Sequence, residues 1–234
     1  MSTGLRKFVT NPPEPVPPKA PAIEKCDMCA AEIAQEHGHV ADLQNSSLIC
    51  ACRACYLLFT RPDAGRYRSI PDRYLTDPAH PITGQEWESL EIPVGLAFFL
   101  RDSRAGTTTA FYPSPAGATE CQLDLQAWDE LAAAHPLLRA ATPDVEAVLM
   151  SRTEPANPIV GPAVGIQHQR RADDGPREQA RGVESFVVPI DACYELAGRM
   201  RLHWRGFDGG SEAKASLEAI LDQVRGRARD LEYG

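Results

Sequence analysis

The sequence predicts an α+β protein in which a small treble-clef or zinc-ribbon-like metal module precedes an α+β domain with a mainly antiparallel sheet. Two Cys-x-x-Cys pairs near the N-terminus predict the metal module. Farther along, apolar runs near positions 94, 107, 145 and 184 are typical of strands, and helical spacing of apolar residues near 125, 192 and 212 predicts helices. We therefore expect a proline-rich tail (1–24), a four-cysteine module (25–62), a linker (63–91) and the α+β domain (92–234).

The tail gives no sign of a targeting segment. Residues 1–24 contain six prolines and no apolar run, so neither a signal peptide nor a targeting helix is expected. No stretch of the chain approaches the ~20 apolar residues that cross a bilayer. We expect a cytoplasmic protein without a membrane span, whose thiols are reduced, and this favours metal binding over disulfides.

The four cysteines of the module have the spacing of a metal site. Cys26 and Cys29 form one pair and Cys52 and Cys55 the other, and four thiolates can surround one Zn²⁺ at about 2.3 Å. The first pair predicts a tight knuckle whose amide N–H groups point at sulfur. The second pair leads into a run without Gly or Pro, which predicts the first turns of a helix that ends before Pro62.

Iron and disulfides are the alternatives to zinc. A rubredoxin-type iron site has the same four-thiolate geometry, but each knuckle usually needs a small residue after its second cysteine. Ala30 satisfies this condition and Tyr56 does not, so we expect zinc, with iron as the alternative metal. Two Cys-x-x-Cys pairs close together also argue against a thioredoxin-like redox pair. Disulfides would require export of the chain.

Three further residues near the pairs could replace one of the four cysteines as a ligand. His37 and His39 lie between the pairs, and Cys50 is a fifth thiol two positions before Cys52. Because four cysteines already complete a tetrahedral site, we expect the histidines on an exposed loop around Gly38 and Cys50 as a buried thiol.

The charge of the chain argues against nucleic acid as a partner. The net charge is −8, so no general attraction to a phosphate backbone is expected. Between Arg53 and Arg73 there are five arginines, interleaved with tyrosines in a manner that could grip a nucleic acid. We expect these arginines to pair with nearby carboxylates instead.

The α+β domain opens with a predicted hairpin. Residues 94–100 are nearly continuously apolar and residues 107–112 are rich in β-branched and aromatic types, with a turn at 102–106. Alternation at 121–125 suggests a further short strand. Apolar residues then continue at helical spacing until Pro136.

The sequence of the rest of the domain predicts two strands and two helices. Strands are expected at 145–150 and 184–190, separated by a proline-containing and then polar loop. We expect Asp191 to cap the helix that follows, with Cys193 in its buried stripe, and Ser211 to cap the last helix. No catalytic motif is visible, so we expect a binding protein without enzymatic activity.

Several segments carry a resemblance to a known family. They lie at 26–30, 48–55, 57–59, 188–196, 203–207 and 209–210. In these segments the chain resembles an uncharacterised bacterial family with an N-terminal four-cysteine motif, typically encoded in gene clusters of high-affinity, oxygen-tolerant [NiFe]-hydrogenases. The resemblance implies no catalytic residues. It implies a protein partner, a [NiFe]-hydrogenase subunit or maturation factor, and a role in assembly, maturation or electron transfer.

Overall fold

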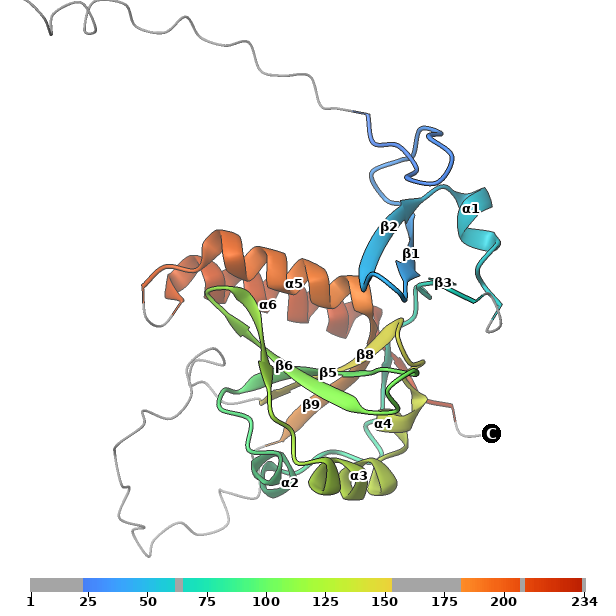
Figure 1. The fold of residues 1–234 in the computed structure, drawn as a ribbon. Helices are drawn as coiled ribbons and strands as arrows, with labels where there is room; N and C mark the ends of the chain where they lie inside the picture. The colour runs from blue at the N-terminus through green and yellow to red at the C-terminus, as the bar shows by residue number, and fades with distance from the viewer. Residues whose placement is uncertain (1–22, 62–64, 153–181, 207–208, 233–234) are drawn as a thin grey trace, which may run out of the picture.

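The computed structural model describes residues 23–61, 65–152, 182–206 and 209–232. These residues form a small three-stranded sheet near the N-terminus and a larger seven-stranded sheet that carries helices on both faces (Figure 1). The architecture is thus the predicted α+β arrangement, with the cysteine pairs on the small sheet. Among the described helices, none combines the length and apolar content needed to span a bilayer.

The small sheet has the strand order β2-β1-β3. Its elements are β1 (Gly38–Asp42), β2 (Ser47–Ala51), β3 (Tyr67–Ser69) and the short helix α1 (Arg53–Leu57), which follows β2 directly. Both neighbours pair antiparallel with β1, so β1 is the central strand. We use the term small module for residues 23–61 together with β3.

The large sheet has the strand order β10-β4-β9-β8-β5-β6-β7. Its strands are β4 (Leu75–Thr76), β5 (Leu96–Arg101), β6 (Thr108–Ser114), β7 (Gly117–Cys121), β8 (Glu146–Arg152), β9 (Val183–Pro189) and β10 (Arg229–Asp230). Every pairing is antiparallel except that of β10 with β4, as a mainly antiparallel sheet requires. The predicted hairpin joins β5 to β6, and the Asp102 carboxylate accepts hydrogen bonds from backbone N–H groups within its turn.

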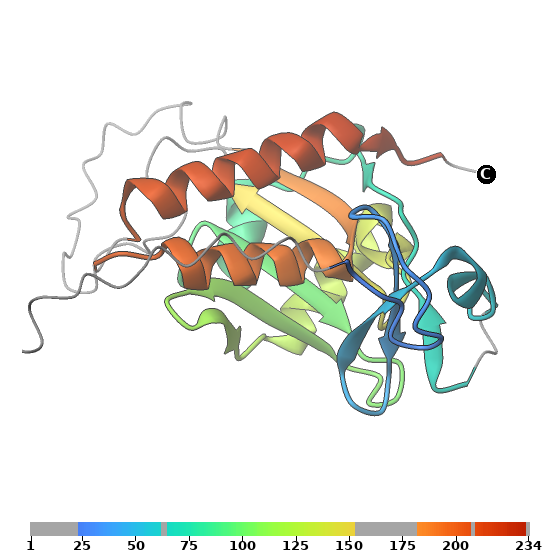
Figure 2. The same ribbon diagram turned by 90° about the horizontal axis from the view of Figure 1, so that it is seen from above.

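Helices cover both faces of the large sheet. The long helices α5 (Ile190–His203) and α6 (Gly210–Arg227) run side by side over one face (Figure 2). The shorter helices α2 (Gly84–Ser89), α3 (Leu125–Ala134) and α4 (Pro136–Ala140) lie on the other face (Figure 1). The sheet is therefore the middle layer of three.

The two-residue period of β5 supplies a core to each face. Leu96 and Phe98 belong to the apolar cluster beneath α5 and α6, whereas Ala97 and Phe99 belong to the cluster on the side of α2 and α3. Fully burying a leucine or phenylalanine side chain contributes about 1.5–3 kcal/mol. The large sheet is thus stabilised by two apolar cores.

Two predicted helix caps are wrong. Asp191 lies in the first turn of α5, whose N-cap is Pro189, and its carboxylate binds His39. Helix α6 begins at Gly210, and Gly209 at its N-cap has φ +82°, a left-handed conformation that glycine adopts without strain. In both cases the chain enters the helix two residues earlier than the polar side chain suggested.

The segment expected as a linker takes part in both sheets. Within 63–91, β3 pairs with β1, β4 pairs with β9, and α2 begins with a capping box between Thr83 and Glu86. This segment therefore connects the small module to the domain through strand pairing. The predicted loop between β8 and β9 lies largely outside the described residues.

Candidate metal centre

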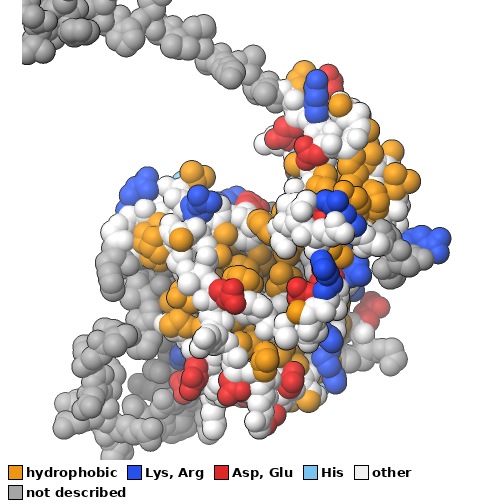
Figure 3. Space-filling model, viewed as in Figure 1, with side chains coloured by type: hydrophobic (Ala, Val, Ile, Leu, Met, Phe, Trp, Pro, Cys, Tyr) orange, Lys and Arg blue, Asp and Glu red, His pale blue; other side chains and the backbone are white. Residues whose placement is uncertain are grey.

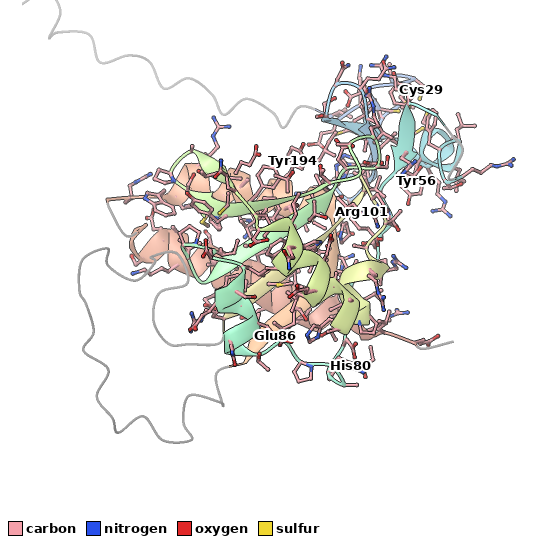
Figure 4. The ribbon with its side chains drawn as sticks, turned by 60° about the horizontal axis from the view of Figure 1, so that its bottom comes forward. Cys29, Tyr56, His80, Glu86, Arg101 and Tyr194 are labelled. Carbon is pink, nitrogen blue, oxygen red and sulfur yellow. The ribbon has the colours of Figure 1, made fainter. Side chains whose placement is uncertain are left out.

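The structure brings the four predicted cysteines together. The sulfur atoms of Cys26, Cys29, Cys52 and Cys55 all lie within 4.8 Å of one another. Cys26 and Cys29 come from the turn that precedes β1, and Cys52 and Cys55 come from the start of α1. In Figure 4, Cys29 and Tyr56 lie in the small module, far from His80 and Glu86 of the large domain. This four-sulfur group could hold one metal ion.

The first cysteine pair forms the predicted knuckle. The Cys26 N–H donates to the Ala31 carbonyl at 2.8 Å, and the Ala30 N–H donates to the Cys26 carbonyl at 2.8 Å. Ala30 has φ +60°, in the left-handed region that the residue after a knuckle adopts. For a residue with a Cβ this conformation costs about 1–2 kcal/mol, so the turn is held by its surroundings.

The second cysteine pair starts a helix, as predicted. Cys52 is the N-cap of α1, and its sulfur accepts a hydrogen bond from the Cys55 N–H at 3.5 Å. Because α1 lacks the knuckle conformation, the two pairs are not equivalent. This geometry is typical of a treble-clef zinc site, whereas a rubredoxin site needs two knuckles.

The sulfur spacing suits a tetrahedral ion. Four sulfurs at about 2.3 Å from Zn²⁺ lie roughly 3.8 Å from one another. The Cys29 and Cys52 sulfurs are 3.6 Å apart, close to that value and far beyond the ~2.05 Å of a disulfide. All seven cysteines are free thiols, so the predicted preference for metal over disulfides agrees with the geometry.

Within the four-sulfur group, hydrogen bonds lower the pKa of some thiols, and the neighbouring sulfurs raise the pKa of others. The Cys52 N–H lowers the pKa of Cys26 to about 6, and the Cys55 N–H lowers the pKa of Cys52. The sulfurs of Cys52 and Cys29 raise the pKa of Cys55 to about 12. Four thiols this close cannot all ionise without a nearby cation, and a divalent metal ion supplies that charge.

The three residues expected as alternative ligands form a group of their own. His37, His39 and Cys50 place their donor atoms within 4.8 Å of one another, in a cluster separate from the four sulfurs. The expected exposed loop around Gly38 is instead the start of β1, and His39 and Cys50 are partly buried and directly opposed in the pairing of β1 with β2.

Gly38 lets α1 pack on the small sheet. A Cβ built at Gly38 would lie 2.6 Å from Cδ2 of Tyr56, so the tyrosine ring covers the space that a side chain would take. The Tyr56 hydroxyl donates to the Ile70 carbonyl at 2.9 Å. Together these contacts fix the helix that carries Cys55.

Two leucines at the C-terminal end of α1 face solvent. Leu57 is 51% exposed and Leu58 is 69% exposed. Figure 3 shows hydrophobic side chains gathered on the face of the small module where α1 lies. The metal group is therefore adjacent to an apolar surface that points to solvent.

At least three of the five arginines expected to pair with carboxylates do so. Arg66 binds Asp42, Arg68 binds Asp144 and Arg73 binds Glu146, whose side chain is fully buried. In Asp42 the neighbouring Arg66 guanidinium holds the carboxyl pKa well below its usual range. These arginines stabilise the fold and do not form an open basic surface.

The structure also shows a cavity and two contacts that the sequence did not reveal. A cavity of about 410 Å³ lies between α3 and the hairpin of β5 and β6, and its charged lining residues are Arg101, Asp129 and Arg139. The Tyr194 hydroxyl donates to the Ser46 carbonyl at 3.3 Å, and Asp191 binds His39. Helix α5 thus contacts the small module at two points. In the sequence, the spacing of His37 and His39 two residues apart is the one signal that could have singled out His39.

Comparisons with known proteins identify one matching family. No curated protein and no solved structure shows significant similarity to the chain. Residues 25–163 and 176–228 match a family of unknown function, DUF5947. The match begins one residue before Cys26 and includes the four-sulfur group, the long helices and every strand of the two sheets except β10. The chain therefore belongs to the DUF5947 family.

Proposed function

We propose that this protein is a non-catalytic zinc-binding accessory protein that associates with a [NiFe]-hydrogenase subunit or maturation factor. The closed four-sulfur group carries the proposal, because four protein ligands leave no open position for a substrate. The zinc ion holds the knuckle and α1 together and thereby presents the surface around Leu57 and Leu58 to a protein partner. The resemblance in the cysteine and α5 segments supports the choice of partner.

Iron in the same site would give a different function. A rubredoxin-like iron centre would pass single electrons to or from the hydrogenase, and the left-handed Ala30 in the first knuckle is compatible with it. The helical second pair favours zinc. A nucleic-acid partner is disfavoured, since Arg66, Arg68 and Arg73 are paired with carboxylates.

Metal analysis of protein purified without chelator tests the zinc assignment. We expect zinc and a colourless solution. Iron accompanied by a visible absorption band would assign the electron-transfer function instead. Absence of both metals would contradict the two functions together.

Affinity purification from the native host tests the partner. Tagged wild-type protein should recover [NiFe]-hydrogenase subunits or maturation factors, and a Leu57→Glu/Leu58→Glu variant should not, because charge on an exposed apolar surface opposes docking. Leu202→Glu is the matched control, since Leu202 is also 69% exposed but lies on α5. Recovery of ribosomes or nucleic acid alone would refute the hydrogenase association.

A further inference from the structure

We propose that His37, His39 and Cys50 form a second metal site, which binds a divalent ion of the zinc and cobalt class beside the four-sulfur group. Their donor atoms lie within 4.8 Å of one another. Two imidazoles and a thiolate are a ligand set that such ions prefer. The site lies on the small module but is distinct from the four cysteines.

Strand geometry brings the three side chains together. Residues two apart in an extended chain point to the same side, which places His37 and His39 on one face. His39 lies directly opposite Cys50 in the pairing of β1 with β2. The two imidazole rings meet edge to face, with centroids 4.9 Å apart. In a tetrahedral site the donors would be roughly 3.3–3.8 Å apart, so small side-chain rotations suffice to close around an ion.

Hydrogen bonds already orient both imidazoles as metal ligands require. The Nδ1 atom of His39 lies 2.8 Å from the Asp191 carboxylate, and the Nδ1 atom of His37 lies 2.9 Å from the Ala34 carbonyl. A proton on each Nδ1 leaves the lone pair on Nε2. Metal-binding histidines typically donate their second N–H to a carboxylate or a carbonyl, and both histidines here have such a partner.

The Nε2 atom of His37 lacks the partner that a metal ion would provide. The His37 side chain is only 10% exposed, and its Nε2 atom is buried without a hydrogen-bond partner among the described residues. A buried polar atom without a partner is costly, and it is rare in folded proteins. A bound cation would accept this lone pair and remove the cost.

The neighbouring knuckle holds Cys50 in place. The Cys50 N–H donates to the Asp27 carboxylate at 2.8 Å, and the Asp27 N–H donates to the Cys50 carbonyl at 2.9 Å. Asp27 lies between Cys26 and Cys29 in sequence, so the knuckle of the first site also positions a ligand of the second. Three protein ligands leave the fourth position to water or to an exogenous ligand.

Zinc stoichiometry tests the second site in the full-length protein. After equilibration with excess ZnCl₂ and removal of unbound ions, wild type should retain about two zinc ions per chain. His37→Ala/His39→Ala and, separately, Cys50→Ser should retain about one. His203→Ala is the control and should retain two, because His203 lies at the end of α5. Cys50→Ser changes only the donor atom, so it tests the site even where the double variant does not fold.

Two further readouts separate a metal site from a structural role. Cobalt-loaded wild type should show visible bands from a nitrogen and sulfur site as well as from a four-sulfur site, and His39→Ala should lose only the former. Asp191→Asn should weaken zinc binding at the second site about 10–100-fold, because it removes the carboxylate that orients His39. One ion per wild-type chain with both zinc and cobalt, or two ions in the double variant, would overturn the proposal. If the second site bound copper alone, its assignment to ions of the zinc and cobalt class would be refuted.

Discussion

The small module and the large domain are stabilised in different ways. Fifteen buried residues form the core beneath α5 and α6, and twelve form the core on the opposite face of the large sheet. In the described part of the small module, the buried apolar residues are Cys26, Val40, Ala41 and Ala51, and Ile70 directly after β3 adds a fifth. Ala41 and Ile70 also pack against Val145 and Ile190 of the large domain. Because so few side chains contribute little against the entropy of ordering the module, we expect metal ligation to supply much of the difference. The comparison predicts that the fold of the small module depends on a bound metal and that the fold of the large domain does not.

The largest expected effect comes from removing one ligand of the four-sulfur group. Cys52→Ser should unfold the small module while the large domain stays folded, since structural zinc contributes about 10–16 kcal/mol in isolated zinc fingers. Circular dichroism and limited proteolysis would detect loss of the module alone. Cys121→Ser is the control because Cys121 lies at the end of β7, outside both metal groups. A fully stable Cys52→Ser module would contradict the difference between the two regions.

The converse substitution should affect only the large domain. Leu217 is a fully buried residue of α6, so Leu217→Ala should lower the free energy of unfolding by about 2–5 kcal/mol. Zinc affinity should be unchanged, because the substitution leaves the cysteines untouched. Urea unfolding monitored by tryptophan fluorescence measures the loss, with the exposed Leu202→Ala as the control. Weaker zinc binding in Leu217→Ala would mean that the two regions fold as one unit.

The close contact between β1 and α1 gives an intermediate effect. Gly38→Ala should destabilise the small module by about 1–3 kcal/mol, because the new methyl group would lie 2.6 Å from the Tyr56 ring. The expected result is weaker zinc binding with an unchanged large domain. In contrast, Gly198→Ala should be neutral or stabilising, since Gly198 lies within α5 and a Cβ there meets nothing within 4 Å. Equal effects of the two substitutions would exclude steric contact as the cause.

In the large domain, one contribution to the free energy of unfolding should depend on pH. Burial alone would raise the pKa of Glu86, but hydrogen bonds from His135 and Thr83 outweigh it and lower that pKa. A carboxyl with a depressed folded pKa stabilises the protein above its unfolded pKa, and this contribution is lost as the pH falls through the folded value. Glu86→Gln should therefore cost about 1 kcal/mol at pH 7 and progressively less below about pH 4. Urea titrations at several pH values provide the test, and a penalty independent of pH would rule out the ionised carboxylate as its source.

The smallest effect concerns the knuckle. Ala30→Gly should stabilise the small module by less than about 1 kcal/mol, because glycine relieves the left-handed strain but gives the unfolded chain more conformational freedom to lose on folding. Zinc competition with a chelator is sensitive enough to measure it. Clearly weaker zinc binding in this variant would show that the alanine methyl group makes a contact needed by the site.

The sequence predicted the local features more accurately than the distant contacts. The Cys-x-x-Cys spacing was sufficient to expect the four-sulfur group, and the apolar runs were sufficient to expect β5, β6, β8 and β9. The pairing of Asp191 with His39 joins residues 152 positions apart, so no local pattern could reveal it. For the same reason the local sequence predicts Asp191 as a helix cap and places β3 and β4 in a linker. Their few residues become strands only by pairing with partners elsewhere in the chain.

Amide hydrogen exchange of the full chain, with and without its metal, tests the central claim most directly. After chelation, we expect protection to disappear from residues 25–61 and from β3, which pairs with β1. Protection in β5, β8 and β9 should be unchanged, because two apolar cores stabilise those strands. If chelation leaves the small module protected, or removes protection from both regions together, the account of a metal-held module beside a self-sufficient domain is contradicted.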